Sequence, residues 1–478
     1  MANLKCMAAA AGDAAGFDDT QVAAITCDSR KAGRNDAFIA FPGEVCDGRD
    51  FIGKTDAGVV IYESGDGFEP VTQAKSFGVS GLRKKLPAMA AAFYGDPSAN
   101  GLKVAGITGT NGKSSTSWYL AQLIDASGGK CGVIGTVGNG FVGHLVPSVN
   151  TTPGPIEIQK TLFAMKEAGA THVAMEVSSH GIAQGRIDGV TFSATAFTNF
   201  TQDHLDFHGT MEEYFAVKRG FILNHDGVPA VLNADDPEIA QKLAGDAGDR
   251  AVLMGSRGAY QVSGIKATGT GTSFVLCRGQ ESAALNLPLI GAFNVMNAVM
   301  ALALAESMLG HRLAPRLLER LKPLSGRMEL FKTPASPLCL VDYAHTPDGV
   351  EKAAAAAREH VSGKVVAVLG CGGDRDKTKR PIMAKTALDI CDELIITDDN
   401  PRTEDPEAIV RDMISGISDR NNFSVVHDRK LAIEKAIKSC SDGDAVLIAG
   451  KGHEDYQIVG AERRHFSDQE TVREILGL

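Results

Sequence analysis

The sequence lacks the features that would anchor it in a membrane or direct it to nucleic acid. None of its 478 residues belong to a stretch approaching the ~18 consecutive apolar residues that a spanning helix needs. The first residues carry no long apolar run either, so we expect neither a signal peptide nor membrane insertion. Acidic residues outnumber basic ones by 58 to 48, and the net charge of −10 argues against a nucleic-acid partner. A local basic pocket for a small anionic substrate is compatible with this balance.

Closely spaced cysteines are also absent. The nine cysteines are an odd number, and no two of them stand closer than Cys27 and Cys46. This spacing excludes Cys-x-x-Cys zinc or redox motifs and favours free thiols in a reducing compartment. We therefore expect a cytoplasmic protein of roughly two to four domains, with no internal repeat or long block of charge.

The clearest positive signal is a glycine-rich loop between an apolar run at residues 102–106 and a helical pattern at residues 118–124. The loop residues are Gly109, Thr110, Asn111, Gly112, Lys113, Ser114 and Ser115. A strand, a glycine-rich loop and a helix N-terminus form an anion site, in which Lys113 would contact phosphates and the Ser114 hydroxyl would bind Mg²⁺. Gly106 stands six residues before Gly112 rather than five, so the match to the P-loop pattern is imperfect. The context nevertheless predicts binding of a nucleoside triphosphate.

The order of apolar runs predicts an α/β protein with three domains. Residues 1–100 combine short strand candidates at 22–26, 38–41 and 59–62 with a helix at 81–94, and they end in a turn-rich linker. For the polar loop around Ser29 we favour plain turn chemistry. Residues 101–326 alternate helical patterns with strand candidates, which after the glycine-rich loop are 131–134, 171–176, 194–198 and 229–232. This alternation predicts a central P-loop-type doubly wound sheet. The alternation restarts at residues 327–478, with strand candidates at 338–341, 364–369, 393–397, 423–426 and 445–448. It predicts a C-terminal Rossmann-like domain with a second parallel sheet.

Two polar clusters of the central region contain possible metal ligands. They are Glu-Val-Ser-Ser-His at residues 176–180 and Asp-His-Leu-Asp-Phe-His at residues 203–208. Oxygen ligands near a phosphate loop suit Mg²⁺. A zinc hydrolase is an alternative because His204 and His208 stand four residues apart, but no His-Glu-x-x-His motif supports it. The histidines could equally cap loops by hydrogen bonding.

Lys218 has an unusual setting for a lysine. Residues 210–213 have the form of a capping box, so a helix should begin there. Its neighbours on one helix face are the apolar Tyr214, Phe215, Phe221 and Ile222. From the pattern alone we favour a side chain that reaches out to water. The alternative is a buried, neutral amine able to react with CO₂ to give a carbamate, a carboxylate that can bridge metal ions.

Three polar loops follow predicted strands of the C-terminal region, at residues 370–376, 398–404 and 450–456. Each contains charged residues, and parallel strands bring such loops to one edge of a sheet. Arginine clamps a carboxylate and a carboxylate accepts an ammonium group, so these loops suit a zwitterionic substrate. Solvated surface charge is the less favoured interpretation.

Taken together, the motifs resemble the Mur ligase family over essentially the whole chain. The motifs are Gly-Thr-Asn-Gly-Lys at 109–113, Asn-Thr-Thr-Pro at 150–153, the two clusters at 176–180 and 203–208, Asn294 with Asn297, Gly-Arg-Met-Glu at 326–329 and Asp-Tyr-Ala-His-Thr-Pro-Asp at 342–348. The resemblance is greatest to members that extend UDP-N-acetylmuramoyl-L-Ala-D-Glu. It implies a first domain for the UDP group, a central ATPase domain and a last domain for the amino acid. The family usually has Lys-Thr-Thr where this chain has Lys113, Ser114 and Ser115, and a serine hydroxyl can do the same work.

The resemblance also implies roles for individual residues. Catalysis would involve Lys113, Glu176, His204 and Lys218, and the metal ligands would be Ser114, Glu176, His204 and carbamylated Lys218. Besides the loop, the nucleotide would contact Asn294, Asn297, Arg327 and Asp342, and the UDP-N-acetylmuramoyl-dipeptide would contact Ser29, Thr151, Thr152, Ser178 and Arg186. Diaminopimelate would be bound by Arg375, Asp399, Asn400, Pro401, Arg402, Gly450 and Glu454. The cofactors would be ATP and Mg²⁺, and we expect a monomer.

The loop Asp-Asn-Pro-Arg at 399–402 matches the form associated with meso-diaminopimelate rather than L-lysine. Diaminopimelate has a distal carboxylate that lysine lacks, and Arg402 could clamp it. The alternatives are the same reaction with L-lysine, a folylpolyglutamate-synthase-like ligase, and a P-loop switch without ligase chemistry. We expect an acyl phosphate intermediate and closure of the C-terminal domain over the site.

Overall fold

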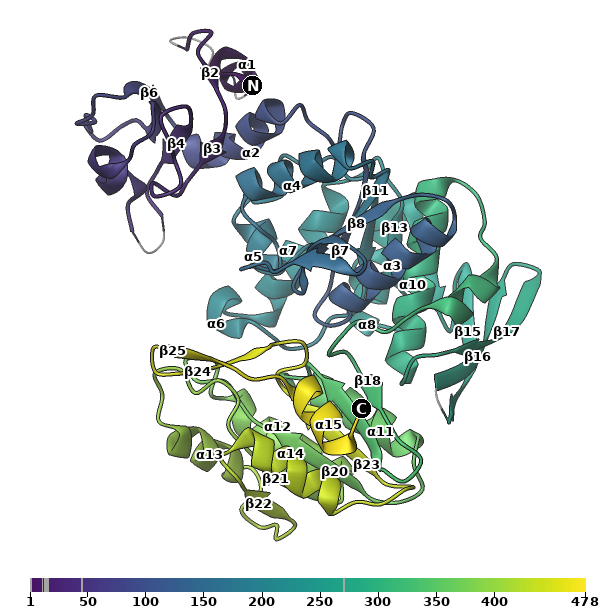
Figure 1. Cartoon of the computed structure of the whole chain (residues 1–478). Coiled ribbons are helices and arrows are strands. Elements are labelled where there is room, and N and C mark those ends of the chain that lie inside the picture. Colours follow the sequence, from purple (N-terminus) through teal and green to yellow (C-terminus); the bar gives the residue numbers. More distant parts are fainter. Residues whose placement is uncertain (1, 11, 13–16, 44–45, 270) are drawn as a thin grey trace. The chain divides into compact units, whose positions relative to one another are not determined.

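The computed structural model describes residues 2–10, 12, 17–43, 46–269 and 271–478 (Figure 1). The chain divides into two compact units, residues 1–108 with 128–195 and residues 109–127 with 196–478. Both units combine helices with mostly parallel sheets, which confirms the α/β prediction. The boundaries of the three predicted domains stay a prediction.

The first unit begins with a small parallel sheet covered by helices. Its strands are β3 (Ile25–Thr26), β4 (Ala37–Ala40), β5 (Val59–Glu63) and β6 (Lys75–Val79), in that order, and its other elements are β1 (Ala2–Asn3), α1 (Leu4–Ala10), β2 (Gln21–Val22), η1 (Gly48–Lys54) and α2 (Leu82–Phe93). Ile39, Ile61, Leu86 and Met89 are fully or almost fully buried in one hydrophobic core. The predicted strand at 22–26 is divided, because only residues 21–22 and 25–26 pair with neighbours.

A second group of paired strands in the first unit carries the polar cluster at residues 176–180. Its strand order is β10 (His144–Val146), β9 (Gly138–Phe141), β8 (Cys131–Gly135), β11 (His172–Glu176) and β7 (Lys103–Thr108), with α4 (Pro155–Glu167) and α5 (Ser179–Ala183) between strands in sequence. β8, β11 and β7 are parallel and buried along most of their length, as central strands of α/β sheets are. The sequence predicted these three strands but not the antiparallel hairpin of β9 and β10.

The second unit contains parallel strands that continue into an antiparallel sheet. The strand order is β12 (Ala194–Phe197), β13 (Ala230–Asn233), β14 (Ala251–Gly255), β15 (Tyr260–Thr268), β16 (Gly271–Arg278) and β17 (Glu281–Leu287). The helices are α3 (Lys113–Ala126), α6 (Leu205–His208), α7 (Met211–Leu223), α8 (Pro237–Lys242), α9 (Ala244–Ala247), η2 (Gly248–Arg250), α10 (Ala292–Leu309) and η3 (Pro315–Arg320). The antiparallel strands β15 to β17 were not predicted from the sequence.

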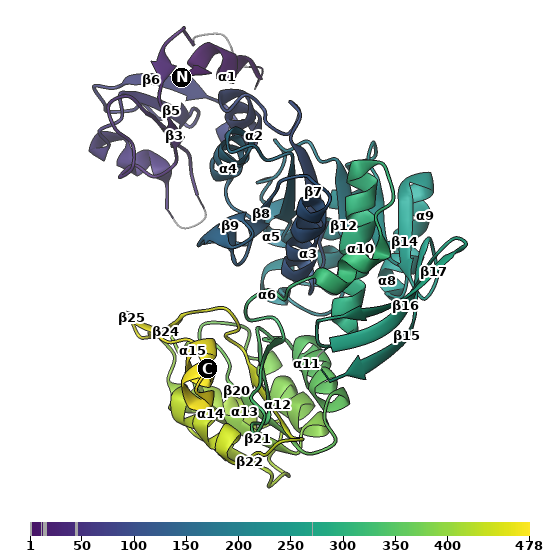
Figure 2. The same ribbon diagram turned by 45° about the vertical axis from the view of Figure 1, so that its right-hand side comes forward.

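Helix α10 is long and apolar enough, by length and composition alone, to cross a membrane, and it is the one such helix in the part of the chain that the structure describes. Of the 18 residues of this helix, 72% are buried within the protein, and Asn294, Asn297 and Glu306 interrupt its apolar sequence. It packs against α3 and lies beside β14 to β16 (Figure 2). These are the properties of a core helix.

The C-terminal part of the second unit is a six-stranded sheet with helices on both faces (Figure 1). The strand order is β18 (Glu329–Phe331), β19 (Leu338–Asp342), β23 (Ala445–Ala449), β20 (Val365–Leu369), β21 (Glu393–Ile396) and β22 (Phe423–Val425), all parallel except β18. One core contains α11 (Pro347–Glu359), α12 (Lys379–Ile390) and α13 (Pro406–Ile414), and the core on the opposite face contains α14 (Arg429–Lys438) and α15 (Asp468–Leu476). This arrangement confirms the predicted Rossmann-like sheet. A hairpin of β24 (Tyr456–Val459) and β25 (Glu462–His465) follows β23.

Candidate active site

The phosphate loop has a backbone that only glycine accommodates at two positions. Gly109 has φ +141° and Gly112 has φ +84°, both outside the range that other residues favour. A Cβ at Gly109 would overlap the Thr198 hydroxyl, and a Cβ at Gly112 would overlap the side-chain amide of Asn297. Helix α3 begins at Lys113, directly after this turn. The loop therefore leads directly into a helix N-terminus, as a phosphate site requires.

Residues that follow β12 hold the loop in place. The Thr110 N–H donates to the Asn199 carbonyl over 2.9 Å, and the Asn111 N–H donates to Asn199 Oδ1 over 2.9 Å. The Thr198 hydroxyl donates to the Asn111 carbonyl over 2.6 Å. Asn111 Nδ2 donates in turn to Asp348 Oδ2 at the start of α11 over 2.7 Å. Thr198 and Asn199 were missed from the sequence, although they are polar residues at the end of a predicted strand.

Two lysines meet at one backbone carbonyl. Lys113 Nζ donates to the carbonyls of Gly109 and Thr110 over 2.9 and 2.8 Å, and Lys218 Nζ donates to the same Gly109 carbonyl over 2.8 Å. Only 1% of Lys218 is exposed, and its ammonium lies 4.8 Å from the centre of the Tyr214 ring. Burial, and secondly the charge of Lys113, lower the pKa of Lys218 well below its ordinary value. The expectation that Lys218 reaches out to water is therefore wrong.

The local sequence explains how Lys218 comes to be buried. The Thr210 side chain accepts from the Glu213 N–H over 3.2 Å, so the predicted cap is present and α7 begins at Met211. The four predicted face neighbours are all buried: Tyr214, Phe215, Phe221 and Ile222. The helix thus turns its apolar face inward and carries the lysine with it.

The loop before α6 brings Asp203 and His204 together. Asp203 Oδ2 lies 3.4 Å from His204 Nε2, and His204 has a left-handed φ of 53°. Burial opposes ionisation of Asp203, but His204, His345 and Lys379 lower the pKa of its carboxyl overall. His208 instead packs its ring against Tyr214 at 5.1 Å. Among the described residues no group of three or more His, Cys, Asp or Glu side chains is placed to hold a metal ion, so the zinc alternative gains no support.

The predicted nucleotide residues outside the loop lie on α10, just before β18 and at the end of β19. Asn294 is buried and structurally engaged, since it accepts from the Tyr119 hydroxyl over 3.0 Å and donates to the Ile290 carbonyl over 2.9 Å. Asn297 lines a cavity of about 540 Å³ formed by the loops after β12 and β13, the start of α10, and α11. A cavity of this size can hold a nucleoside.

Arg327 connects the phosphate loop with the segment around β19. Its guanidinium lies 4.5 Å from the centre of the Tyr343 ring and donates to Ser114 Oγ over 3.4 Å. Asp342 ends β19 and accepts from the Met328 N–H over 2.7 Å. Burial raises the pKa of the Asp342 carboxyl. Ser115, the last residue of the loop, is buried at the start of α3. The loop, Arg327 and Asn297 are thus gathered in the second unit.

In the first unit, Glu176 ends β11 and is held by hydrogen bonds. Glu176 Oε1 accepts from the Thr136 N–H over 2.8 Å, and Oε2 accepts from the Thr136 hydroxyl over 3.1 Å. The Thr136 and Thr151 hydroxyls lie 3.0 Å apart. Thr136 follows β8 and was missed from the sequence, because a lone threonine after a strand carries no distinctive pattern.

The predicted substrate residues of this unit form one group around the end of β11. The Thr152 hydroxyl donates to the Glu176 carbonyl over 3.0 Å and accepts from the Ser178 N–H over 2.9 Å. Arg186 Nη1 donates to the Thr152 carbonyl over 2.8 Å. Ser29 belongs to the small sheet instead, in the loop after β3, where its carbonyl accepts from the Thr55 hydroxyl over 3.1 Å.

The three C-terminal loops meet at one edge of the sheet, because they follow the adjacent parallel strands β23, β20 and β21. Asn400 Nδ2 donates to Glu454 Oε2 over 2.8 Å. Gly450 has φ +117°, and a Cβ there would lie 2.6 Å from Asp399 Oδ2. Arg402, in a left-handed conformation with φ 54°, donates to the Gly373 carbonyl over 2.8 Å.

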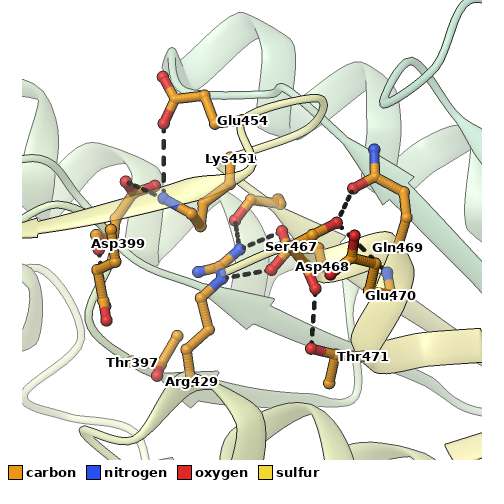
Figure 3. A network of polar contacts seen from close by, with 12 residues as sticks. Thr397, Asp399, Arg429, Lys451, Glu454, Ser467, Asp468, Gln469, Glu470 and Thr471 are labelled. Atoms are coloured by element: carbon orange, nitrogen blue, oxygen red, sulfur yellow. Dashed lines mark hydrogen bonds and ion pairs between the residues drawn. The ribbon is translucent and has the colours of Figure 1, made fainter. Parts of the chain in front are cut away.

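The remaining predicted residues of this edge differ in their exposure. Arg375 is exposed and donates to the Asp374 carbonyl over 3.3 Å. The Pro401 carbonyl approaches Gly373 so closely that a Cβ on the glycine would overlap it. Lys451 is fully buried beside Asp399 and Glu454 (Figure 3), and the sequence analysis did not single it out. The signal for it in the sequence was a lysine two residues after a buried strand.

Comparisons with known proteins agree with this geometry. The family description "Mur ligase middle domain" matches residues 107–305, and "Mur ligase, glutamate ligase domain" matches residues 326–452. A UDP-N-acetylmuramoyl-L-alanyl-D-glutamate–2,6-diaminopimelate ligase of Vibrio vulnificus (strain YJ016) is 41% identical over 483 residues, which cover 96% of this chain and 95% of the relative. A solved structure of a ligase with the same name is 33% identical, with a TM-score of 0.66 and 95% of each chain covered.

A folylpolyglutamate synthase of Mycobacterium tuberculosis, solved with ADP and AMPPCP, is similar in fold alone. It is 18% identical, with a TM-score of 0.64, and the match covers 83% of this chain and 95% of that one.

Proposed function

The chain belongs to the Mur ligase family, and we propose that it joins meso-diaminopimelate to the D-Glu γ-carboxylate of UDP-N-acetylmuramoyl-L-Ala-D-Glu. As a Mur ligase it is an ATP-dependent, ADP-forming enzyme. The observation that carries the proposal is the edge of the C-terminal sheet, where Arg402 lies near the hydrogen-bonded pair of Asn400 and Glu454. A guanidinium and an acidic group together suit a substrate with an extra carboxylate and an amine.

The first chemical step would form an acyl phosphate. A γ-carboxylate oxygen attacks the γ-phosphorus of ATP, and the bond to the bridging oxygen breaks to release ADP. The backbone N–H groups at the start of α3 and the Lys113 ammonium would bind the phosphates, and Arg327 would balance their charge. The residues that the resemblance assigns to the dipeptide, Thr152 and Arg186 among them, would hold the acceptor carboxylate.

The second step would form the amide. The amine nitrogen of diaminopimelate attacks the acyl carbon, the carbon–oxygen bond to the phosphate breaks, and inorganic phosphate leaves while the nitrogen loses its proton. The protein contributes mainly by holding the reactants in line and by electrostatic stabilisation. We propose that closure of the C-terminal domain brings the amine to the acyl phosphate.

Mg²⁺ is part of this proposal, and each donor assigned to it has chemistry that suits the ion. Ser114 offers a hydroxyl, Glu176 a carboxylate fixed by Thr136, and Lys218 an amine whose lowered pKa favours reaction with CO₂. His204 would be a further ligand. When bound, the ion would neutralise charge on the phosphates. We also propose that the protein is a monomer in the cytoplasm. Buried free thiols such as Cys131 and Cys371 suit that reducing location.

Phosphate release tests the reaction directly. The protein is incubated with ATP, Mg²⁺ and UDP-N-acetylmuramoyl-L-Ala-D-Glu, and either meso-diaminopimelate or L-lysine is added. We expect release that depends on diaminopimelate. Release with lysine instead would keep the family and overturn the substrate choice, whereas release indifferent to any amino acid would favour a P-loop switch.

Arg402 provides the matching variant. Arg402→Met should raise the KM for diaminopimelate by about 30-fold or more, since a carboxylate loses its charged partner. The KM for ATP should stay unchanged. Arg411→Met is the control, because Arg411 is exposed and its ion pair with Asp405 spans 3.4 Å. An unchanged KM for diaminopimelate in the Arg402 variant would contradict its role as selector.

A further inference from the structure

Lys451 is a buried cation at the edge of the C-terminal sheet. Its side chain has no exposed surface. Its ammonium lies 3.7 Å from Asp399 Oδ1 and 3.5 Å from Glu454 Oε2 (Figure 3). It also lies 3.3 Å from Asn400 Oδ1. A buried ammonium needs such partners, because leaving water costs far more than one hydrogen bond returns. The lysine therefore joins two loops of the candidate amino-acid site, those after β21 and β23.

Lys451 and the Ile458 N–H together determine which way the Asn400 amide faces. Asn400 Oδ1 accepts from Lys451 Nζ and from the Ile458 N–H, the latter over 2.9 Å. Both groups are donors only, so the amide oxygen must point toward them. Asn400 Nδ2 is consequently directed at Glu454 Oε2, 2.8 Å away. The position of the Glu454 carboxylate thus depends on Lys451 twice, directly and through Asn400.

The charges of this cluster do not cancel. Asp399 and Glu454 supply two carboxylates, and Lys451 supplies one ammonium. Arg429, a further cation that interacts with both carboxylates, is engaged elsewhere: its Nε and Nη2 donate to Asp468 over 2.7 and 2.8 Å (Figure 3). The cluster is therefore left with one net negative charge, which is complementary to an ammonium group.

We propose that Lys451 is a positioning residue of the amino-acid site, which fixes Asn400 and Glu454 and leaves one negative charge for an ammonium group of the incoming diamino acid. Lys451 itself does not contact the substrate. This inference rests on the proposed function, since it concerns the same site.

The ionisation of Glu454 depends on the same contacts. Burial raises the pKa of its carboxyl, Asp399 raises it further, and Lys451 and Asn400 oppose the rise. The other titratable or charged groups that interact with Glu454 are Tyr343, Tyr456 and Arg429. Removing the lysine charge should therefore favour protonated Glu454, and more strongly at low pH than at high pH.

The test compares Lys451→Met with the wild type in diaminopimelate-dependent phosphate release. We expect the KM for diaminopimelate to rise by about 30-fold, while the KM values for ATP and the UDP-linked dipeptide change by less than about twofold. The rise should shrink as the pH increases, because high pH restores the Glu454 charge. Lys451→Arg keeps the charge and should recover most of the affinity. Arg278→Met is the matched control, a buried cation paired with Glu306 on α10.

The outcomes separate this proposal from the proposed function. A wild type that does not depend on diaminopimelate overturns both. A diaminopimelate-dependent wild type with an unchanged KM in Lys451→Met, or with a defect that does not vary with pH, overturns the role of Lys451 alone. Lys451→Gln is the second uncharged variant, because its amide can still bond to Glu454 if methionine prevents folding. Failure of both variants to fold would mean a purely structural role and would also overturn the proposal.

Discussion

Replacing Lys218 with methionine should make the protein more stable and at the same time inactive. The ammonium of Lys218 is buried and shares the Gly109 carbonyl with the ammonium of Lys113. Burying a charge costs several kcal/mol, whereas a hydrogen bond to a charged group returns about 1.5–3 kcal/mol. Methionine has a similar size and suits the apolar neighbours Tyr214 and Phe221. We therefore expect a gain in unfolding free energy of about 1–2 kcal/mol at neutral pH.

The pH dependence of this gain follows from the lowered pKa of Lys218. Burial and Lys113 bring it well below 10.5 in the folded protein. Between the folded pKa and 10.5 the unfolded chain binds more protons, so the stability of the wild type rises with pH. The slope is at most about 1.4 kcal/mol per pH unit. The advantage of the methionine variant should accordingly shrink as the pH rises, and disappear above 10.5.

The assay is urea unfolding followed by fluorescence of Trp118, the one tryptophan of the sequence, which lies on α3 beside the phosphate loop. Unfolding is measured in CO₂-free buffer between about pH 7 and pH 9.5. Lys242→Met is the control, because Lys242 is an exposed lysine of α8. Equal pH slopes for wild type and Lys218→Met, or a clear loss of stability at neutral pH, would refute the reasoning and mean a charged, well-solvated lysine.

Bicarbonate adds a second arm to this experiment. A carbamate on Lys218 would turn a repulsive neighbour of Lys113 into an attractive one. Bicarbonate should therefore stabilise the wild type and leave Lys218→Met unchanged. Phosphate release by the variant should fall by about 100-fold, whether or not bicarbonate is present. Full activity of the variant would exclude a role for Lys218 in the reaction.

Two further predictions concern backbone shape and a buried ion pair. Gly112→Ala should abolish ATP binding measured by calorimetry, because the new Cβ overlaps a side chain of α10. Gly128→Ala is the control, since Gly128 also has a positive φ of +87° but open space around it, and it should bind ATP normally. Normal binding by both variants would show that the loop is not the ATP site. Asp468→Asn should lower the stability of the C-terminal sheet by about 3 kcal/mol, because Arg429 loses a fully buried, charged partner. Glu474→Gln breaks an exposed ion pair with Lys430 and should change the stability by less than about 0.5 kcal/mol. Hydrogen exchange of the amides of α14 measures both, and equal effects would contradict the burial argument.

Local sequence determined most of the fold and the identity of the loops. Parallel strands are continuous apolar runs, so β8, β11, β20 and β23 were predicted to within a residue or two. The glycines of the phosphate loop are required by its backbone, so that site could also be predicted. The strands β15 to β17 were missed, because their alternating burial, seen in β16, is a weak pattern once strands and helices are expected to alternate.

Tertiary structure alone decided how the charged residues are used. The pattern around Lys218 fits both an exposed and a buried lysine, and only the packing of α7 decided for burial. The same holds for Lys451, whose partners Asp399 and Glu454 come from two different loops. The burial of a charge depends on contacts between distant segments, and the sequence around one residue carries no information about its distant partners. The sequence therefore specifies which groups are available, and the packing of the strands and helices sets their ionisation and their role.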